Sequence, residues 1–268
     1  MTSGKKTKAT RNSVAAARSQ VVAAKPKPWG TIIAVIAVLA LAGGVFGYAY
    51  SQISANNAKE AALAKWKPSE DNKDPSDKIT GVVKREYKPG KHIDAPKRVA
   101  YDFSPPFGGP HDVQWADCNG VVYEKATRTE NMVHAMEHGS VWLAYNPDQI
   151  KDEALNKLKA KIEGQPFSIM SPYPGLDKPI SVQTWGHQLK LESADDERID
   201  QFISSLRRNQ YTYPEVGSPC DNAQFVDAPA PFVADAPGAD AEPMGDEAEA
   251  KRGQASTAPS STAPSSGN

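Results

Sequence analysis

The spacing of its histidines is the clearest indication in this sequence of a residue group that could do chemistry. His134 and His138 stand four positions apart in the segment 133–139, which has the sequence VHAMEHG. In a helix, positions four apart share one face, so both imidazoles could reach one metal ion. In an extended segment they would also point the same way, beside Met132 and Met136, and thioether plus imidazole donors suit copper. Either conformation therefore predicts a metal site, with copper somewhat favoured over zinc.

Further donors to this site would come from His111, Glu137 and, secondarily, His92. The GGP run before His111 places this residue on a rigid loop, which suits a ligand that arrives from a distant part of the chain. Glu137 could bind the metal or fix an imidazole tautomer. We expect the ring nitrogens of His111, His134 and His138 to lie within about 3–5 Å of one another. The alternative is a buried network of Glu137 and histidines that stabilises the fold without a metal.

Residues 134–138 also spell H-x-x-E-H, the motif of inverted zinc metallopeptidases, in which Glu137 would be the general base. In those enzymes the motif lies inside a longer helix, whereas here Gly139 follows at once and a strand is predicted next. This departure favours a non-enzymatic protein and leaves a zinc peptidase as the lesser alternative. The remaining histidine, His187, falls in a predicted strand and is interpreted as structural.

A compact α+β domain over residues 78–221 must position these side chains. Thr127 and Glu130 have the spacing of a capping box for a short helix, which Gly139 would end. The predicted strands cover residues 79–87, 98–103, 141–145, 167–170 and 180–191. Two further helices are predicted, one from Asn146-Pro147 to residue 162 and one after residues 193–196.

An apolar segment near the N-terminus is long enough to cross a membrane. Residues 29–50 lie within a stretch without charge, and as a helix they would span about 33 Å, against roughly 30 Å for a hydrocarbon core. Residues 1–28 contain seven Lys and Arg and no acid, which predicts a cytoplasmic N-terminus and an extracytoplasmic remainder. We interpret the segment as an uncleaved signal-anchor in the cell membrane. A cleaved signal peptide is the alternative, although its apolar region is usually shorter.

The net charge of −1 hides a strong asymmetry along the chain. Residues 1–51 carry a net charge of +7 and residues 221–268 a net charge of −6. Because the positive charge lies at one terminus and not on the folded part, no nucleic-acid binding is expected. Residues 51–77 are predicted to form a stalk and linker. Residues 222–268, rich in Ala, Pro, Ser and acids, are predicted to be a disordered tail.

The chain has two cysteines, Cys118 and Cys220, and the predicted topology places both outside the cytoplasm, where disulfides persist. A bridge between them would close a loop of about 100 residues and contribute roughly 4–5 kcal/mol, less any strain. Free thiols or a metal-ligand role for Cys118 remain the alternatives.

Several short segments carry a resemblance to a known family: GGPH at 108–111, CNGVVY at 118–123, VHAMEHG at 133–139, SPYPGL at 171–176, WG at 185–186 and GSPC at 217–220. Over residues 80–221 the chain resembles domain-of-unknown-function family 3105, and in particular its actinobacterial members. The resemblance implies a membrane-anchored or exported protein whose shared polar residues are mainly His111, His134, Glu137 and His138. It implies no established activity and no catalytic residues. Met136 stands where leucine is commoner in the family, which weakens the methionine argument for copper.

Two classes of function follow from the sequence. The first is an extracytoplasmic metal-binding domain that holds copper or zinc through the histidine cluster. The second is an interaction or assembly subunit, anchored beside a larger membrane complex, whose histidines are structural. The metal content of the purified protein distinguishes the two.

Overall fold

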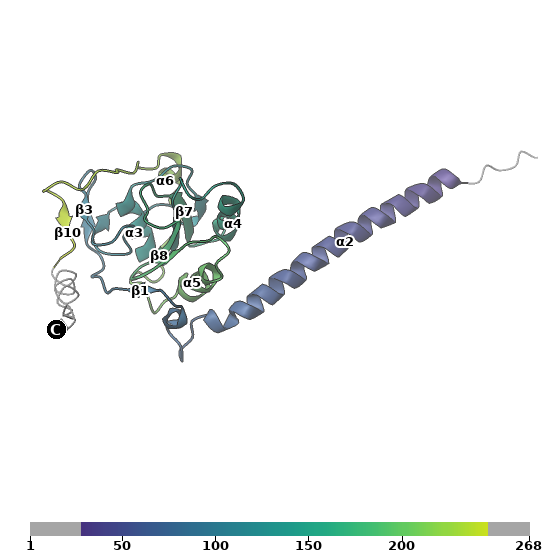
Figure 1. The fold of residues 1–268 in the computed structure, drawn as a ribbon, viewed down its shortest axis with the longest axis horizontal. Helices are drawn as coiled ribbons and strands as arrows, with labels where there is room; N and C mark the ends of the chain where they lie inside the picture. The colour runs from purple at the N-terminus through teal and green to yellow at the C-terminus, as the bar shows by residue number, and fades with distance from the viewer. Residues whose placement is uncertain (1–27, 246–268) are drawn as a thin grey trace, which may run out of the picture. The chain divides into compact units, whose positions relative to one another are not determined.

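The computed structural model describes residues 28–245, and these divide into two compact units. The first unit ends at Lys59 and the second begins at Glu60. Helix α2 (Trp29–Leu63) forms the described part of the first unit and ends just inside the second (Figure 1). The expected cytoplasmic tail over residues 1–28 lies almost entirely outside the described residues.

Helix α2 continues without a break through the predicted span and ends at Leu63, about halfway through the predicted stalk and linker. None of its side chains is buried, and its most apolar stretch has a mean hydropathy of 2.4. Within residues 28–245 it is the one helix long and apolar enough to cross a bilayer. Exposing such a surface to water costs about 25 cal/mol per Å² of apolar area, and a lipid environment removes that cost.

A six-stranded mixed sheet forms the centre of the second unit. The order of its strands is β1 (Val83–Lys84), β9 (His187–Leu191), β8 (Ile180–Thr184), β6 (Val141–Tyr145), β7 (Ser168–Pro172) and β5 (Asn119–Val122). Strands β5 and β6 pair with β7 in parallel, and the other neighbours are antiparallel. Two short parallel pairs stand beside the sheet: β2 (His92–Ile93) with β4 (His111–Asp112), and β3 (Val99–Ala100) with β10 (Glu242–Pro243).

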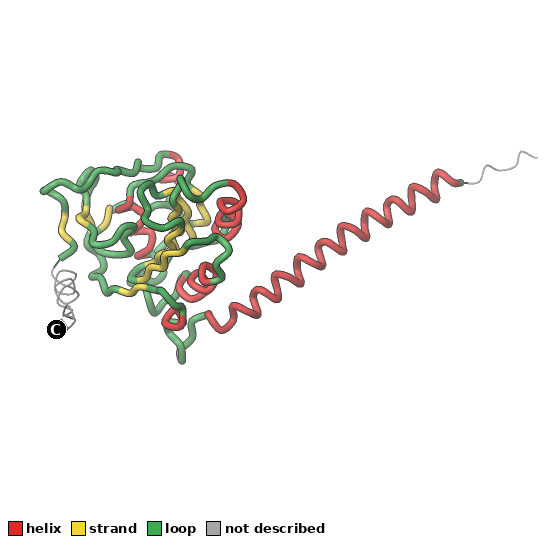
Figure 2. Tube along the Cα trace, viewed as in Figure 1, coloured by secondary structure: helices red, strands yellow, loops and turns green. Residues whose placement is uncertain are grey.

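Helices cover both faces of this sheet, which explains why every residue of β6 is buried. On one face Val141 and Leu143 pack against α4 (Asp152–Ile162) and α5 (Arg198–Leu206). On the other face Trp142 and Ala144 pack in a second core with α3 (Thr129–Glu137). Figures 1 and 2 show α3 apart from α4 and α5, with the strands between them. The α+β class predicted from the sequence is confirmed.

The structure corrects several predicted elements. The first predicted strand reduces to β1. The helix predicted from Asn146 to residue 162 is α4 and begins at Asp152, and the Asn146 side chain instead donates to the Leu176 carbonyl. Residues 180–191 form a hairpin of two strands. The predicted capping box is absent, because Arg128 occupies the N-cap position of α3 without a side-chain capping hydrogen bond, and the Glu130 carboxylate accepts a hydrogen bond from the Val99 amide.

The folded domain is longer than residues 78–221. Before it, Trp66 is buried in the first core and the short helix η2 (Pro75–Lys78) packs near α5, so the second half of the predicted stalk and linker is part of the domain. After it, α6 (Ala223–Asp227) buries Phe225, and Phe232 stacks against Tyr173. The predicted disordered tail therefore cannot begin at residue 222. Residues 246–268 of that tail lie outside the described residues.

The docked segment after residue 222 gives the first prediction. Phe225 is 4% exposed, so Phe225→Ala should lower the free energy of unfolding by about 3 kcal/mol through lost apolar burial. Chemical denaturation of the full-length protein in detergent measures this loss. Val226, at 42% exposed, is the matched control, and Val226→Ala should change stability by less than about 0.5 kcal/mol. Equal stability of the two variants would show that α6 does not dock.

Candidate metal centre

Three histidines from three elements meet in the second unit. His92 and His111 are paired in register across β2 and β4, and His134 comes from α3. The ring centroids are 4.8 Å apart for His92 and His111, 4.7 Å for His111 and His134, and 4.9 Å for His92 and His134. Glu137 lies one turn after His134 on the same helix face. The ligating atoms of these four residues all lie within 4.8 Å of one another.

A buried ion-pair network holds β4 against the beginning of α3. The Arg128 guanidinium pairs with the Asp112 carboxylate and lies 3.3 Å from an oxygen of Glu130. All three side chains are nearly inaccessible to solvent. Breaking such a pair would leave a buried charge uncompensated, so the network fixes where β4 and α3 sit relative to each other. His111 and His134 are thereby placed side by side.

Backbone carbonyls orient two of these imidazoles. His111 donates through Nδ1 to the Gly109 carbonyl at 2.8 Å, and His134 donates through Nδ1 to the Asp112 carbonyl at 2.7 Å. A carbonyl oxygen only accepts, so Nδ1 carries the proton in each ring. Nε2 is then the nitrogen with a free lone pair. Such outer contacts commonly orient metal-binding histidines.

Glu137 completes the cluster and is fully buried. Its Oε1 accepts a hydrogen bond from the Gly90 amide at 2.7 Å, and its Oε2 lies 2.8 Å from His111 Nε2. These two atoms form a buried ion pair when His111 is protonated, and neither has another hydrogen-bond partner among residues 28–245. Four donors that converge in a buried site could share one metal ion, which would take the place of that proton. The residues present therefore fit a metal ion.

The electrostatics of two donors, His134 and Glu137, favour the protonation states that a metal requires. Burial, followed by the neighbouring His111 and His138, lowers the pKa of His134 to about 3, so its imidazole is neutral at pH 7. Burial opposes ionisation of Glu137, but the adjacent His111 and the Gly90 amide outweigh it and hold the Glu137 pKa below its ordinary value. The cluster thus contains a neutral imidazole and a carboxylate.

The structure brings His111 and His134 together but replaces His138 by His92 in this group. His138 follows the end of α3 and forms a second group with His134 and Glu215. Glu215 is not predictable from the sequence, because no spacing relates it to a histidine 77 positions earlier.

Neither methionine belongs to the cluster. Met132 and Met136 are two positions before and after His134, which places both roughly 200° around the helix from it. Each is 0% exposed and packs in the second apolar core. The preference for copper that rested on these two thioethers is therefore removed.

Glycine at position 139 lets the chain turn from α3 into β6. Its φ is +94°, and a Cβ there would lie 2.7 Å from the Tyr213 ring. The turn fixes the end of the helix directly after His138. This agrees with the predicted helix stop. The H-x-x-E-H segment therefore ends just before the first residue of β6, a central strand of the sheet.

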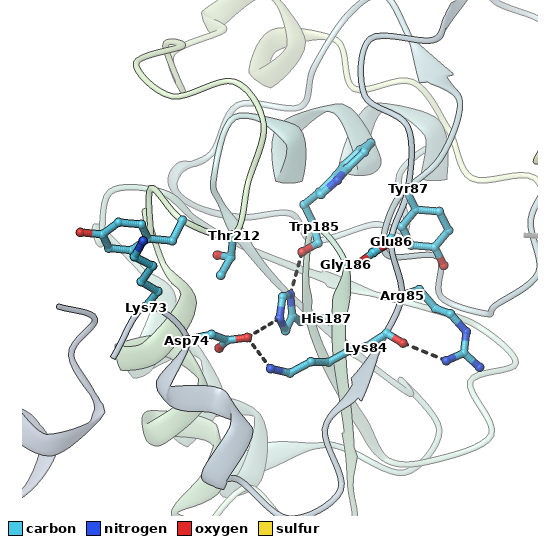
Figure 3. A pocket seen from close by; sticks show the side chains of 11 residues that line it. Lys73, Asp74, Lys84, Arg85, Glu86, Tyr87, Trp185, Gly186, His187 and Thr212 are labelled. Carbon is cyan, nitrogen blue, oxygen red and sulfur yellow. Dashed lines mark hydrogen bonds and ion pairs between the residues drawn. The ribbon is translucent and has the colours of Figure 1, made fainter. Parts of the chain in front are cut away.

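His187 lies outside the cluster, in an open pocket of about 500 Å³ (Figure 3). Its Nδ1 is 2.9 Å from the Trp185 carbonyl and its Nε2 is 2.9 Å from the Asp74 carboxylate, which also pairs with Lys84. Burial opposes the Asp74 charge, but the hydrogen bonds from His187 and Lys84 hold the Asp74 pKa well below its ordinary value. Both ring nitrogens are used, as expected for a structural histidine.

Cys118 and Cys220 lie at disulfide distance, with their Cα atoms 4.9 Å apart. The Cys118 amide also donates to the Cys220 carbonyl at 3.1 Å. The preceding residue, Pro219, accepts the Nδ1 hydrogen bond of His138 at 2.7 Å. The cysteine pair therefore anchors the loop that orients His138.

Residues 92–222 match the family model described as protein of unknown function (DUF3105). The domain belongs to the DUF3105 family. No curated protein and no solved structure matches the chain. The DUF3105 match covers residues 92–222. It therefore includes all the histidines and carboxylates of the two groups of potential metal ligands, and also Cys118 and Cys220.

The cysteine pair gives the second prediction. Peptide mapping of the unreduced protein should recover Cys118 linked to Cys220. Replacing both by alanine should lower the free energy of unfolding by roughly 4 kcal/mol, because the unfolded chain regains the entropy of an open loop. Denaturation of the double variant, compared with wild type before and after reduction, measures this. Two free thiols in protein taken from the cell envelope would contradict the bond.

Proposed function

We propose that this protein is a membrane-anchored, extracytoplasmic domain that binds one divalent transition-metal ion. The ligands are His92, His111, His134 and Glu137. The observation that carries the proposal is the convergence of three imidazoles on the fully buried Glu137 carboxylate, with the ligand atoms within 4.8 Å of one another. A network that existed only to stabilise the fold would instead keep a proton between His111 Nε2 and Glu137 Oε2, which lie 2.8 Å apart.

Zinc and copper(II) are the ions that this donor set suits best. Three imidazole nitrogens and one carboxylate oxygen supply four protein ligands, the number found in closed tetrahedral zinc sites. Imidazole also suits copper(II), whereas copper(I) prefers the thioethers and thiolates that this cluster lacks among the described residues. The bound ion would supply positive charge that neutralises Glu137 and links β2, β4 and α3.

The anchor is helix α2, acting as a signal-anchor with its N-terminus in the cytoplasm. The support is the uncharged apolar stretch and the seven preceding basic residues, following the positive-inside rule. A domain exported in this way would meet metal ions outside the cytoplasm, where the cysteine pair would also persist as a disulfide.

Peptide hydrolysis receives less support from the site. A general base must face the metal-bound water with a free carboxylate oxygen. Glu137 instead uses one oxygen for the Gly90 amide and places the other beside His111. A role as an interaction or assembly subunit of a membrane complex remains the alternative if the cluster holds no metal.

Metal content gives the third prediction. Full-length protein purified in detergent should retain about one zinc or copper ion per chain by inductively coupled plasma mass spectrometry. His134→Asn should abolish retention, because it removes a central ligand. His187→Asn is the matched control and should retain the metal, since His187 lies in a separate pocket. A wild type without metal, even after incubation with zinc and copper, would favour the interaction-subunit alternative.

Topology gives the fourth prediction. An epitope tag fused after Asn268 should be removed by protease added to intact cells, while a tag before Met1 should be protected. Both tags should remain on one chain, because an uncleaved anchor keeps the N-terminus. A mature chain that begins near residues 55–58 would instead identify a cleaved signal peptide. Protection of the C-terminal tag would reverse the orientation.

A further inference from the structure

His134 belongs to two groups of potential metal ligands. One is the four-ligand group with His92, His111 and Glu137, and the other contains His138 and Glu215. We propose that His138 and Glu215 form a second position for the metal ion, and that the ion enters and leaves the four-ligand position through it while His134 stays bound. This inference rests on the proposed function and specifies the route of the ion.

The two positions cannot be filled at once. His134 donates its Nδ1 proton to the Asp112 carbonyl, so only Nε2 can bind a metal. A neutral imidazole offers one lone pair at that nitrogen, which serves one ion at a time. An ion that moves from one group to the other therefore exchanges His92, His111 and Glu137 for His138, Glu215 and water, and keeps a single bond to His134.

The spacing of the rings favours such an exchange. The His134 and His138 ring centroids are 4.6 Å apart, close to the 4.7 Å between His111 and His134. His138 is oriented like the other two ligands, because its Nδ1 donates to the Pro219 carbonyl and leaves Nε2 free. That Nε2 lies 3.2 Å from Glu215 Oε2. Three histidines with the same tautomer thus form a continuous row.

The second position has the chemistry of an exchange site and not of a storage site. It offers three protein ligands, so at least one coordination position would hold water, as in open zinc sites. The Glu215 side chain is 36% exposed, whereas Glu137 is fully buried. A partly exposed carboxylate such as that of Glu215 attracts cations from solvent and releases them more readily than a buried carboxylate does. His92 is also exposed, so direct entry beside it is the competing route.

The surroundings keep this row in place. The Trp115 ring packs against both His134, at 5.6 Å, and His138, at 5.0 Å between centroids. The loop that carries Glu215 and Pro219 ends at Cys220, which is held against Cys118. Since both ends of the row are constrained, the ion can change partners without movement of the backbone.

Zinc exchange kinetics of the full-length, metal-free protein in detergent test the route. Stopped-flow mixing with Zn²⁺ gives the association rate, and mixing of the zinc-loaded protein with excess coloured chelator gives the release rate. Glu215→Gln and His138→Asn should each slow association and release alike, by about tenfold, because they raise the barrier and leave the final position unchanged. The dissociation constant and the stoichiometry of one ion should stay the same.

Glu163→Gln is the matched control for Glu215, because Glu163 is also an exposed carboxylate and lies at the end of α4. It should leave both rates unchanged. Unchanged rates in Glu215→Gln and His138→Asn would overturn the route and indicate direct entry beside His92. Faster release with weaker binding would overturn it too, since the two residues would then hold the final ion. Two zinc ions per wild-type chain would contradict the shared ligand. A wild type that binds no zinc or copper would instead refute the proposed function itself.

Discussion

A fully buried carboxylate, Glu137, is the constraint on which the arrangement of this domain depends. A carboxylate without solvent is stable only if nearby donors or positive charge compensate it. Here the compensation comes from the Gly90 amide before β2 and from His111 on β4. Two short strands, neither part of the main sheet, are thereby tied to α3. These two contacts outweigh the cost of burial, and an ion bound by the proposed ligands would add positive charge at the same place.

The main sheet fixes the position of α3 by packing against it. Strand β6 is buried on both faces, and the apolar face of α3 packs against it with Met132 and Met136. Those two side chains fill core volume and leave the opposite face of the helix for His134 and Glu137. Packing of the apolar face fixes the helix, and this fixes the positions of the polar side chains on its other face. A short helix can therefore hold potential ligands within a narrow range of distances.

The loop at residues 215–220 connects the cluster to the cysteine pair. It supplies the Pro219 carbonyl and the Glu215 carboxylate, and the cysteine pair fixes its end. A disulfide at this position would do more than limit the unfolded chain, because it would also set the orientation of His138. Anchoring outside the cytoplasm, the cysteine pair and the metal site would then depend on one another.

The sequence by itself determined the features that arise from local pattern. Twenty-two uncharged residues at 29–50, the helical spacing of His134 and His138, and the apolar run at 141–145 each depend on neighbours within a few positions. The α+β class and the helix stop at Gly139 followed from the same kind of evidence. The boundaries at 78 and 221 did not, because Trp66 and Phe225 are buried by residues far away in the chain.

Only the tertiary structure decided which donors share a metal position. His92 joins His111 because β2 and β4 pair in register, and Glu215 reaches His138 because the loop folds back beside the end of α3. Neither contact has a spacing signature, since each links residues through strand pairing or loop docking. The two methionines that suggested copper also depend on tertiary structure. They lie on the helix face that packs against the sheet, so they are buried in the core and cannot reach the cluster.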